Sequence, residues 1–425
     1  MPWPDPGARP SPARGPQVLQ IVLPNGLTVL GESDEHAETV ALGYFVRTGA
    51  RDETLQDLGA SHFIEHLLFK GSERVSGREL NVRLDALGAN VNAFTSEETT
   101  VYHAACLPET WPELLSLLTE LMQPAFRPAD VEIERGVILE EIAMYADDPS
   151  SRTFDELRAQ AWGTHPLGHL VLGTPQTVAG LTLERLQDNF RSRYGTGSVT
   201  LVACGRFDWN ALVTAALALT SAWPQGNFTR ALSPHSFSAG LQIVEDTDMN
   251  RANIAFLAPG LQASHPLREA AVVLAEILGG DNGRLYWALV DGGLADSVDL
   301  SHVEFEETGA FEGAWSCDPT RAGQTLEVVR GELQRVQLES VTEAELARAR
   351  KKLAVSVALR AETPYARLFT LGMDHTYLGR TPSVAESVAA FERVSRTEVE
   401  EVLALRPFDA LNIVVLGPPA GQFPA

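Results

Sequence analysis

Two histidines and a glutamate stand close together in an otherwise apolar segment of the chain. His62, Glu65 and His66 fall within SHFIEHLLFKG, residues 61–71. On a helix, side chains four residues apart lie on one face, so the two imidazoles can point at a common centre. Imidazole nitrogens are good zinc ligands, and a catalytic zinc site needs three protein ligands and an open position. The spacing therefore predicts a zinc site, with Glu65 beside it as a general base for water.

The third protein ligand must come from elsewhere in the chain. The segment IERGVILEEIAMYADDP carries Glu134, Glu140 and Glu141 on a predicted helix that is rich in isoleucine and valine. Glu134 and Glu141 share a face, whereas Glu140 is rotated by about 100° from Glu141. Carboxylates on an apolar face fit a metal ligand and a carboxylate that supports it. An exposed acidic stripe is the alternative that spacing alone leaves open.

A second pair of histidines has the same spacing but a different local context. His165 and His169 lie in HPLGH, where Pro166 and Gly168 disfavour a helix. Rings on such a segment would not be stacked on one face. We interpret HPLGH as a loop.

Composition and charge narrow the function classes. The chain has 425 residues, 44% of them hydrophobic, as is typical of a globular protein. Its 56 acidic against 33 basic residues give a formal net charge of -23, which argues against nucleic acid as a partner. Cys106, Cys204 and Cys317 are isolated, and we find no apolar signal segment or membrane-span pattern. These features predict a cytoplasmic protein with a disordered leader over residues 1–16.

The elements that must position these residues follow from periodicity and turn residues. Asn25-Gly26 between two β-rich runs predicts a hairpin over residues 19–31. The polar turn at residues 96–98 separates two strands within 90–107. Further segments are a strand over 39–53 and helices over 76–89, 110–123 and 129–145.

The second half of the chain is a weak repeat of the first. Residues 221–240 gather Pro, Ser and Gly and read as a linker, which is followed by strands over 240–261 and helices over 268–280 and 342–362. SHFIEHLLFKG aligns with AAVVLAEILGG, which lacks the histidines, so packing alone does not require them. We predict an α+β fold of two similar domains, each an antiparallel sheet with helices packed on one face. The predicted parts are a zinc-binding domain over 17–222, a linker over 223–240, and a domain without a metal site over 241–425.

With these motifs the chain resembles the pitrilysin-type inverted-zincin metallopeptidases, in the short-chain branch of bacterial processing-type peptidases and the mitochondrial processing peptidase β subunit. The resemblance covers nearly the whole length. It implies two αβ-roll domains, zinc as cofactor, and the site residues His62, His66 and Glu141 as ligands, Glu65 as base and Glu134 as supporting acid. The segments that carry it are PNGLTV, HFIEHLLFKG, GANVNAFTSEETTVY, ERGVILEEI, DDPS, HPLGHLVLGT and LGGDNGRL.

The resemblance also implies how a peptide substrate is held. Asn92 and Ala93 match the family's edge strand, which binds a peptide backbone as an added β-strand. In active single-type members, an Arg and a Tyr of the second domain then hold the substrate in a closed chamber. This chain has Val290 and Asp296 at those positions.

The absence of this Arg/Tyr pair, which we call the clamp, determines the function that we expect. We expect a zinc endopeptidase subunit that hydrolyses peptides or unfolded segments as a heterodimer with a homologous subunit carrying the Arg/Tyr pair. One alternative is a catalytically idle structural or peptide-binding subunit of the same fold. Another is a homodimer that uses a different clamp, such as Arg284.

Overall fold

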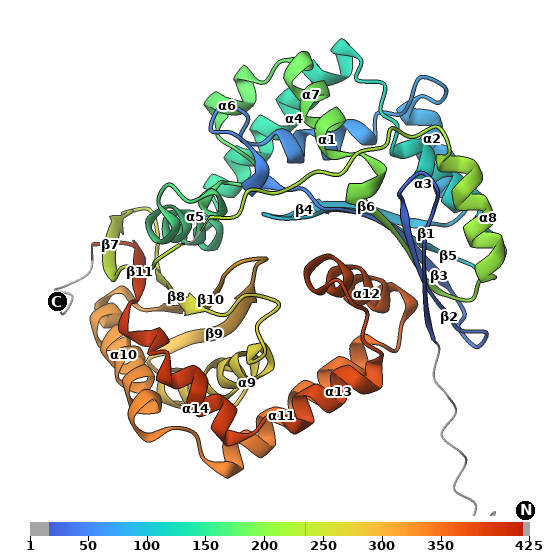
Figure 1. Cartoon of the computed structure of the whole chain (residues 1–425). Helices are drawn as coiled ribbons and strands as arrows, with labels where there is room; N and C mark the ends of the chain where they lie inside the picture. Colours follow the sequence, from blue (N-terminus) through green and yellow to red (C-terminus); the bar gives the residue numbers. More distant parts are fainter. Residues whose placement is uncertain (1–16, 234, 420–425) are drawn as a thin grey trace, which may run out of the picture.

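The computed structural model describes residues 17–233 and 235–419, arranged as two sheets with helices around them (Figure 1). The predicted leader, residues 1–16, lies outside the described residues. The first sheet has the strand order β1-β2-β6-β3-β5-β4, and the second has the order β7-β11-β8-β10-β9. The strands of the first sheet are β1 (Val18–Val22), β2 (Thr28–Ser33), β3 (Val40–Val46), β4 (Asn90–Thr95), β5 (Thr100–Cys106) and β6 (Val199–Gly205). Those of the second are β7 (Gly240–Glu245), β8 (Ala252–Gly260), β9 (Ala295–Glu304), β10 (Gly309–Cys317) and β11 (Asn412–Gly417).

The two sheets repeat one topology. When β2, β6, β3, β5 and β4 are matched with β7, β11, β8, β10 and β9, the strand orders agree, and β1 is an addition to the first sheet. Both sheets are antiparallel apart from one parallel pair, β2 with β6 and β7 with β11. In each half the last strand lies in the sheet interior beside the first of the shared strands and runs in the same direction as it. The predicted α+β fold of two similar domains is confirmed.

Helices cover the outer face of each sheet. In the first half they surround the large core cluster around Phe63, Leu67 and Tyr102. They are α1 (Ala60–Leu68), α2 (Gly77–Ala86), α3 (Trp111–Leu121), α4 (Pro128–Ala146), α6 (Pro175–Gly180), α7 (Leu183–Arg193) and α8 (Trp209–Thr220). In the second half they are α9 (Arg268–Gly279), α10 (Ala322–Glu339), α11 (Glu343–Arg360), α13 (Val384–Arg393) and α14 (Arg396–Ala404). No helix in the described part of the chain is long and apolar enough to cross a membrane.

One helix of each half also packs on the sheet of the other half. The helix α12 (Pro364–Leu378) places Leu368 and Leu371 against Phe45 of the first sheet, on the face opposite α1 (Figure 1). Gly372 allows this close approach, because a Cβ there would lie 2.3 Å from the Phe45 ring. In return, α5 (Pro149–Trp162) packs Leu157 on β8 and β11.

The sequence predicts helices on one face of each sheet. Because of this exchange, the other face of each sheet is also covered by a helix. A strand that is buried on both faces reads as a continuous apolar run, as β3 does with the sequence VALGYFV. The domain boundaries at 17–222 and 241–425 therefore stay a prediction, because the packing of the two halves is interleaved in the described residues.

Candidate metal centre

The helix that carries both histidines is fixed at its start by a buried carboxylate. Glu53 accepts hydrogen bonds from the backbone N–H groups of Gly59 (2.8 Å) and Ser61 (2.6 Å). These donors belong to the first turn of α1, where backbone N–H groups have no partner inside the helix. Consecutive turns of α1 then bring the rings of His62 and His66 to a centroid separation of 4.6 Å.

Glu141 on α4 completes a group of three metal-ligating side chains. Its Oε2 lies 3.7 Å from Nε2 of His62 and 3.5 Å from Nε2 of His66. The ligand atoms of the three residues all lie within 4.8 Å of one another. These separations exceed the usual hydrogen-bond length, and the three atoms are close enough together to contact one ion.

A zinc ion fits this group. Two bonds of about 2.0–2.1 Å that meet at a tetrahedral angle separate their ligand atoms by about 3.4 Å. The separations of 3.7 and 3.5 Å between Glu141 and the two histidines are close to that value. Glu140, which the helical spacing turns away from Glu141, is exposed, whereas Glu141 is partly buried beside the histidines.

Glu134 supports His66 without joining the ligand group. Its Oε2 lies 3.0 Å from Nδ1 of His66, and its other oxygen is paired with the ammonium of Lys70. With the proton of His66 held on Nδ1 toward Glu134, the lone pair of Nε2 faces Glu141.

The two histidines have different titration behaviour in the metal-free chain. Burial, reinforced by the neighbouring His66, lowers the pKa of His62 to about 3. Burial also acts to lower the pKa of His66, but the hydrogen bond to Glu134 and the carboxylates of Glu65 and Glu141 outweigh it and raise that pKa. His62 is therefore neutral over the physiological pH range, which is the form that can ligate a metal.

Glu65 stands beside the ligand group and is held by a strand. The hydroxyl of Thr95 at the end of β4 donates to its Oε2 at 2.6 Å, which leaves Oε1 free of this bond. Burial raises the pKa of Glu65, although the hydrogen bond from Thr95 acts to lower it. A carboxylate whose pKa is raised toward neutrality is a stronger base for water than an exposed one.

The predicted substrate strand lies at the margin of the first sheet. Asn92 and Ala93 are on β4, the terminal strand, where they pair with His103 and Tyr102 of β5. The opposite margin of β4 carries no strand in the described part of the chain. HPLGH forms a 3-10 turn over Pro166–Gly168 and not a helix, as the loop interpretation requires.

Three residues of the centre escaped sequence reasoning: Glu53, Lys70 and Thr95. Lys70 is four residues beyond His66, so its helical spacing could have placed it near Glu134. Thr95 is two residues after Ala93 on β4, so both side chains lie on the same face of the strand, the face toward α1. Nothing in the sequence pattern marked Glu53, because its role depends on the backbone of a segment that folds back onto it.

The second half lacks free groups at the predicted clamp positions. Asp296 is paired with Arg251, and Val290 lies in the short helix Tyr286–Asp291. Arg284 is engaged by Glu345 through its Nε (2.7 Å) and Nη2 (2.9 Å). This pairing weighs against Arg284 as a substitute clamp.

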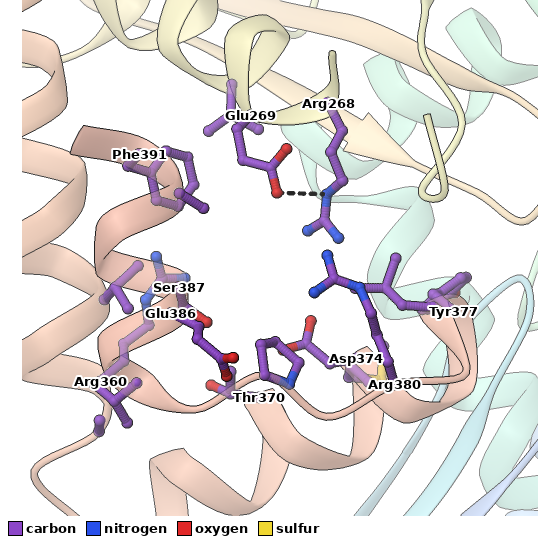
Figure 2. Close-up of a pocket in the computed structure, with 18 of the residues that line it drawn as sticks. Arg268, Glu269, Arg360, Thr370, Asp374, Tyr377, Arg380, Glu386, Ser387 and Phe391 are labelled. Atoms are coloured by element: carbon purple, nitrogen blue, oxygen red, sulfur yellow. Dashed lines mark ion pairs between the residues drawn. The ribbon is translucent and has the colours of Figure 1, made fainter. Parts of the chain in front are cut away.

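A separate cavity of about 620 Å³ lies among α9, α12 and α13. Figure 2 shows Arg268 and Arg380 extending into it, with Asp374 beside Arg380 and Glu386 across the cavity. None of the predicted site residues lines it. The cavity therefore belongs to the joint between α12 and the second half and not to the metal centre.

Fold and site together define a class: a two-domain αβ protein with a His-His-Glu metal group and a buried carboxylate at one sheet margin. Residues 28–175 match the family model described as Insulinase (Peptidase family M16), and residues 180–353 match the one described as Peptidase M16 inactive domain. The chain belongs to peptidase family M16, and the resemblance seen in the sequence is confirmed.

Named relatives agree with this membership over nearly the whole chain. An uncharacterized zinc protease of Streptomyces coelicolor is 31% identical, covering 94% of this chain and 90% of the relative. The mitochondrial-processing peptidase subunit beta of Bos taurus is 27% identical, covering 96% and 86%.

Solved structures share the fold. A peptidase M16 inactive domain from Pseudomonas fluorescens has a TM-score of 0.89 at 18% identity, covering 96% of this chain and 99% of that one. A protease from Helicobacter pylori has a TM-score of 0.88 at 18% identity, covering 95% and 100%. At such identities the likeness concerns the fold alone.

Proposed function

We propose that this chain is the zinc-bearing subunit of an endopeptidase that hydrolyses peptides or unfolded segments. The observation that carries the proposal is the convergence of His62, His66 and Glu141 on one space beside the buried Glu65. Membership of a peptidase family and relatives named zinc proteases support both the reaction and the metal.

The chemistry divides between the metal and the chain. A zinc ion held by the three ligands would polarise the scissile carbonyl and make water more acidic. Glu65 accepts the proton of the attacking water on Oε1, while Thr95 holds its other oxygen in place. The same carboxyl group can then deliver that proton to the leaving amine. Glu134 keeps His66 in the tautomer whose Nε2 can coordinate.

The margin of β4 is the proposed substrate site. Unpaired backbone N–H and C=O groups along a sheet margin can bind an extended peptide as a further strand. Asn92 and Ala93 lie on β4 two to three residues before Thr95, which contacts Glu65. A peptide paired with β4 would therefore run past the proposed base.

A homologous partner subunit supplies the opposing wall in this proposal. The second half offers Val290 and the paired Asp296 where an Arg and a Tyr would grip the substrate. The relative from Bos taurus is named as a subunit, which supports a heterodimer. The three cysteines of the chain are buried and unpaired, which fits the proposed cytoplasmic location.

Peptide cleavage by the zinc-loaded chain tests the reaction. The chain, its Glu65→Gln variant and its Glu140→Gln variant are each incubated with an unfolded polypeptide, alone and with an Arg/Tyr-bearing homologue. We expect Glu65→Gln to lose cleavage by a factor of about 10² to 10⁴, and Glu140→Gln to retain it. Cleavage that survives unchanged in Glu65→Gln would contradict the proposed base.

An idle peptide-binding subunit is the second candidate. Residues 180–353 match a model described as an inactive domain, and the clamp residues are absent. On this alternative, the chain binds peptides along β4 but cleaves none with any homologue. The complete ligand group with an adjacent base favours the peptidase.

A further inference from the structure

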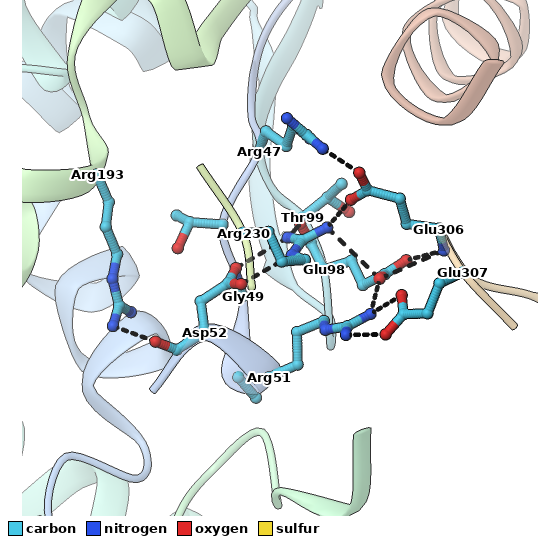
Figure 3. A network of polar contacts seen from close by, with 12 residues as sticks. Arg47, Gly49, Arg51, Asp52, Glu98, Thr99, Arg193, Arg230, Glu306 and Glu307 are labelled. Carbon is cyan, nitrogen blue, oxygen red and sulfur yellow. Dashed lines mark hydrogen bonds and ion pairs between the residues drawn. The ribbon is translucent and has the colours of Figure 1, made fainter. Parts of the chain in front are cut away.

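Eight charged side chains form a network where the two halves of the chain meet (Figure 3). We call this set the interface network. It holds four cations and four anions, so its formal charges cancel. Side chains of Arg51, Glu98 and Arg230 are no more than 3% exposed. The members are Arg47, Arg51, Arg193 and Arg230 with Asp52, Glu98, Glu306 and Glu307.

Arg230, in the segment between the halves, reaches three different parts of the protein. Its Nε and Nη2 donate to the two carboxylate oxygens of Asp52 at 2.7 and 2.8 Å. Its Nη2 also donates to the backbone carbonyl of Glu98 at 2.7 Å. Its Nη1 donates to Glu306 of the second half at 2.8 Å. The segment between the halves is thus anchored here and is not a free hinge.

These contacts fix the turn that follows β4. The turn spans residues 96–99, and the backbone N–H groups of Ala50 and Arg51 donate to its carbonyls at 3.1 and 2.9 Å. From the second half, the N–H of Glu306 donates to the Glu98 carboxylate at 3.1 Å. Arg230 completes the enclosure of the turn. Thr95, whose hydroxyl donates to Glu65, immediately precedes this turn.

The start of α1 is tied to the same place. Asp52 receives the fork of Arg230, and its neighbour Glu53 accepts the first N–H groups of α1. One short segment therefore connects Arg230 with the helix that carries His62 and Glu65 and with the strand that carries Thr95.

We propose that Arg230 is a positioning residue for the metal centre. It holds β4 in place relative to α1, so that Thr95 keeps its hydrogen bond to Glu65 and the free margin of β4 stays aligned with the metal centre. The activity part of this inference rests on the proposed peptidase function. The structural part does not, because the order of β4 can be measured without substrate.

The effect of losing Arg230 follows from burial. In Arg230→Met, an unbranched side chain replaces the aliphatic stem of the arginine, but Asp52, Glu98 and Glu306 lose a shared cation. A buried charge without its partner is strongly destabilising unless the structure shifts to hydrate it. The turn after β4 is the element that can move, so β4 becomes less ordered.

Arg367 on α12 is a matched control. It also makes a buried ion pair between the halves, with its Nε 3.0 Å and its Nη2 2.7 Å from Glu32 of β2. In the sheet order, β2 is separated from β4 by β6, β3 and β5. Arg367→Met thus removes a comparable pair at β2. The same helix contacts β4 through Phe369 and Phe94, so this control also tests whether a general loosening of α12 reaches the substrate margin.

The experiment compares full-length, zinc-loaded wild type with Arg230→Met, Arg230→Lys and Arg367→Met. Amide hydrogen exchange is followed in residues 90–99, together with zinc content and thermal midpoint. The kcat and KM for peptide cleavage are measured with the Arg/Tyr-bearing homologue present. In Arg230→Met we expect exchange in that segment to rise by about tenfold or more while zinc is retained. We expect kcat to fall by about tenfold to hundredfold. In Arg367→Met the thermal midpoint falls while exchange in residues 90–99 stays within about twofold of wild type.

Specific results would overturn the inference. Exchange in residues 90–99 that is unchanged in Arg230→Met, or raised equally in Arg367→Met, would show that Arg230 only stabilises the fold. If Arg230→Met does not fold, the Arg230→Lys variant is decisive, because lysine keeps the positive charge but cannot bind both oxygens of Asp52 at once. Exchange of residues 90–99 at the wild-type rate in Arg230→Lys would then contradict the positioning role. Failure of wild type to cleave any peptide even with the Arg/Tyr-bearing homologue present would count against the proposed function and leave the exchange comparison decisive.

Discussion

Nδ1 of His66 lies 3.0 Å from a carboxylate oxygen of Glu134, on the same helix that presents Glu141 to Nε2 of the same ring. Both contacts come from α4, two turns apart. One helix therefore supplies a proposed metal ligand and the carboxylate that orients another ligand. The exposed neighbour Glu140 offers a matched control for both roles.

Metal content should follow the ligand group. We expect about one zinc per wild-type chain and none at stoichiometric level in His62→Ala or Glu141→Ala, because each loses one of three protein ligands. Glu65→Gln and Glu140→Ala should retain the metal. Elemental analysis of dialysed protein is the measurement, and equal zinc in wild type and His62→Ala would refute the assignment.

Glu134 should affect zinc affinity rather than zinc stoichiometry. Replacement of a carboxylate that orients a ligating histidine typically weakens metal binding by about 10- to 100-fold. Competition with a chelator should show this loss in Glu134→Gln and none in Glu140→Gln. Loss of cleavage should be largest for Glu65→Gln, smaller for Glu134→Gln, and absent for Glu140→Gln. If Glu140 and Glu141 variants lose activity equally, the assigned register of α4 is wrong.

Zinc binding should weaken as the pH falls, beginning above the ordinary histidine value. A proton must leave His66 before Nε2 can coordinate, and the pKa of His66 is raised in the metal-free chain. Affinity is therefore full above this raised pKa and falls by about tenfold per pH unit below it. His62, with its pKa near 3, does not compete with the metal in this window. Chelator titrations between pH 5 and 9 check this. In Glu134→Gln the midpoint should move to lower pH, and an unmoved midpoint would show that Glu134 does not control His66.

The chain alone should bind zinc yet cleave peptides poorly. Val290 cannot donate a hydrogen bond from its side chain, and Asp296 is already paired with Arg251. Addition of a homologous subunit with the Arg/Tyr pair should raise activity without adding metal. The assay compares the chain, the partner and their equimolar mixture. A lone chain as active as the mixture would favour the homodimer over the heterodimer.

The interleaved helices should make the two halves unfold together. Leu371 of α12 is fully buried against the first sheet, so Leu371→Ala should lower the free energy of unfolding by about 2–5 kcal/mol. Leu338→Ala, at a side chain that is 78% exposed on α10, should change it by less than about 0.5 kcal/mol. Denaturant unfolding followed by tryptophan fluorescence should show a single transition for both variants. Two separate transitions would indicate halves that fold independently.

The sequence by itself determined the local features of this protein. The His-x-x-Glu-His spacing requires only one helix to bring His62 and His66 together, and α1 forms where the apolar pattern predicts it. The hairpin at Asn25-Gly26, the helix carrying Glu134 and Glu141, and the repeat of the two halves are likewise encoded in short-range periodicity and turn residues.

The tertiary structure decided what depends on contacts between distant segments. Glu141 became the third member of the group because α4 packs on α1, and Glu140 became exposed for the same reason. The exchange of α5 and α12 could not be predicted from chain order, because the apolar face of a helix does not show which of the two sheets it packs against. The contacts of Thr95 with Glu65 and of Arg230 with Asp52 join residues 30 and 178 positions apart. No periodicity spans such distances, so only the packing of the complete chain brings these polar groups together.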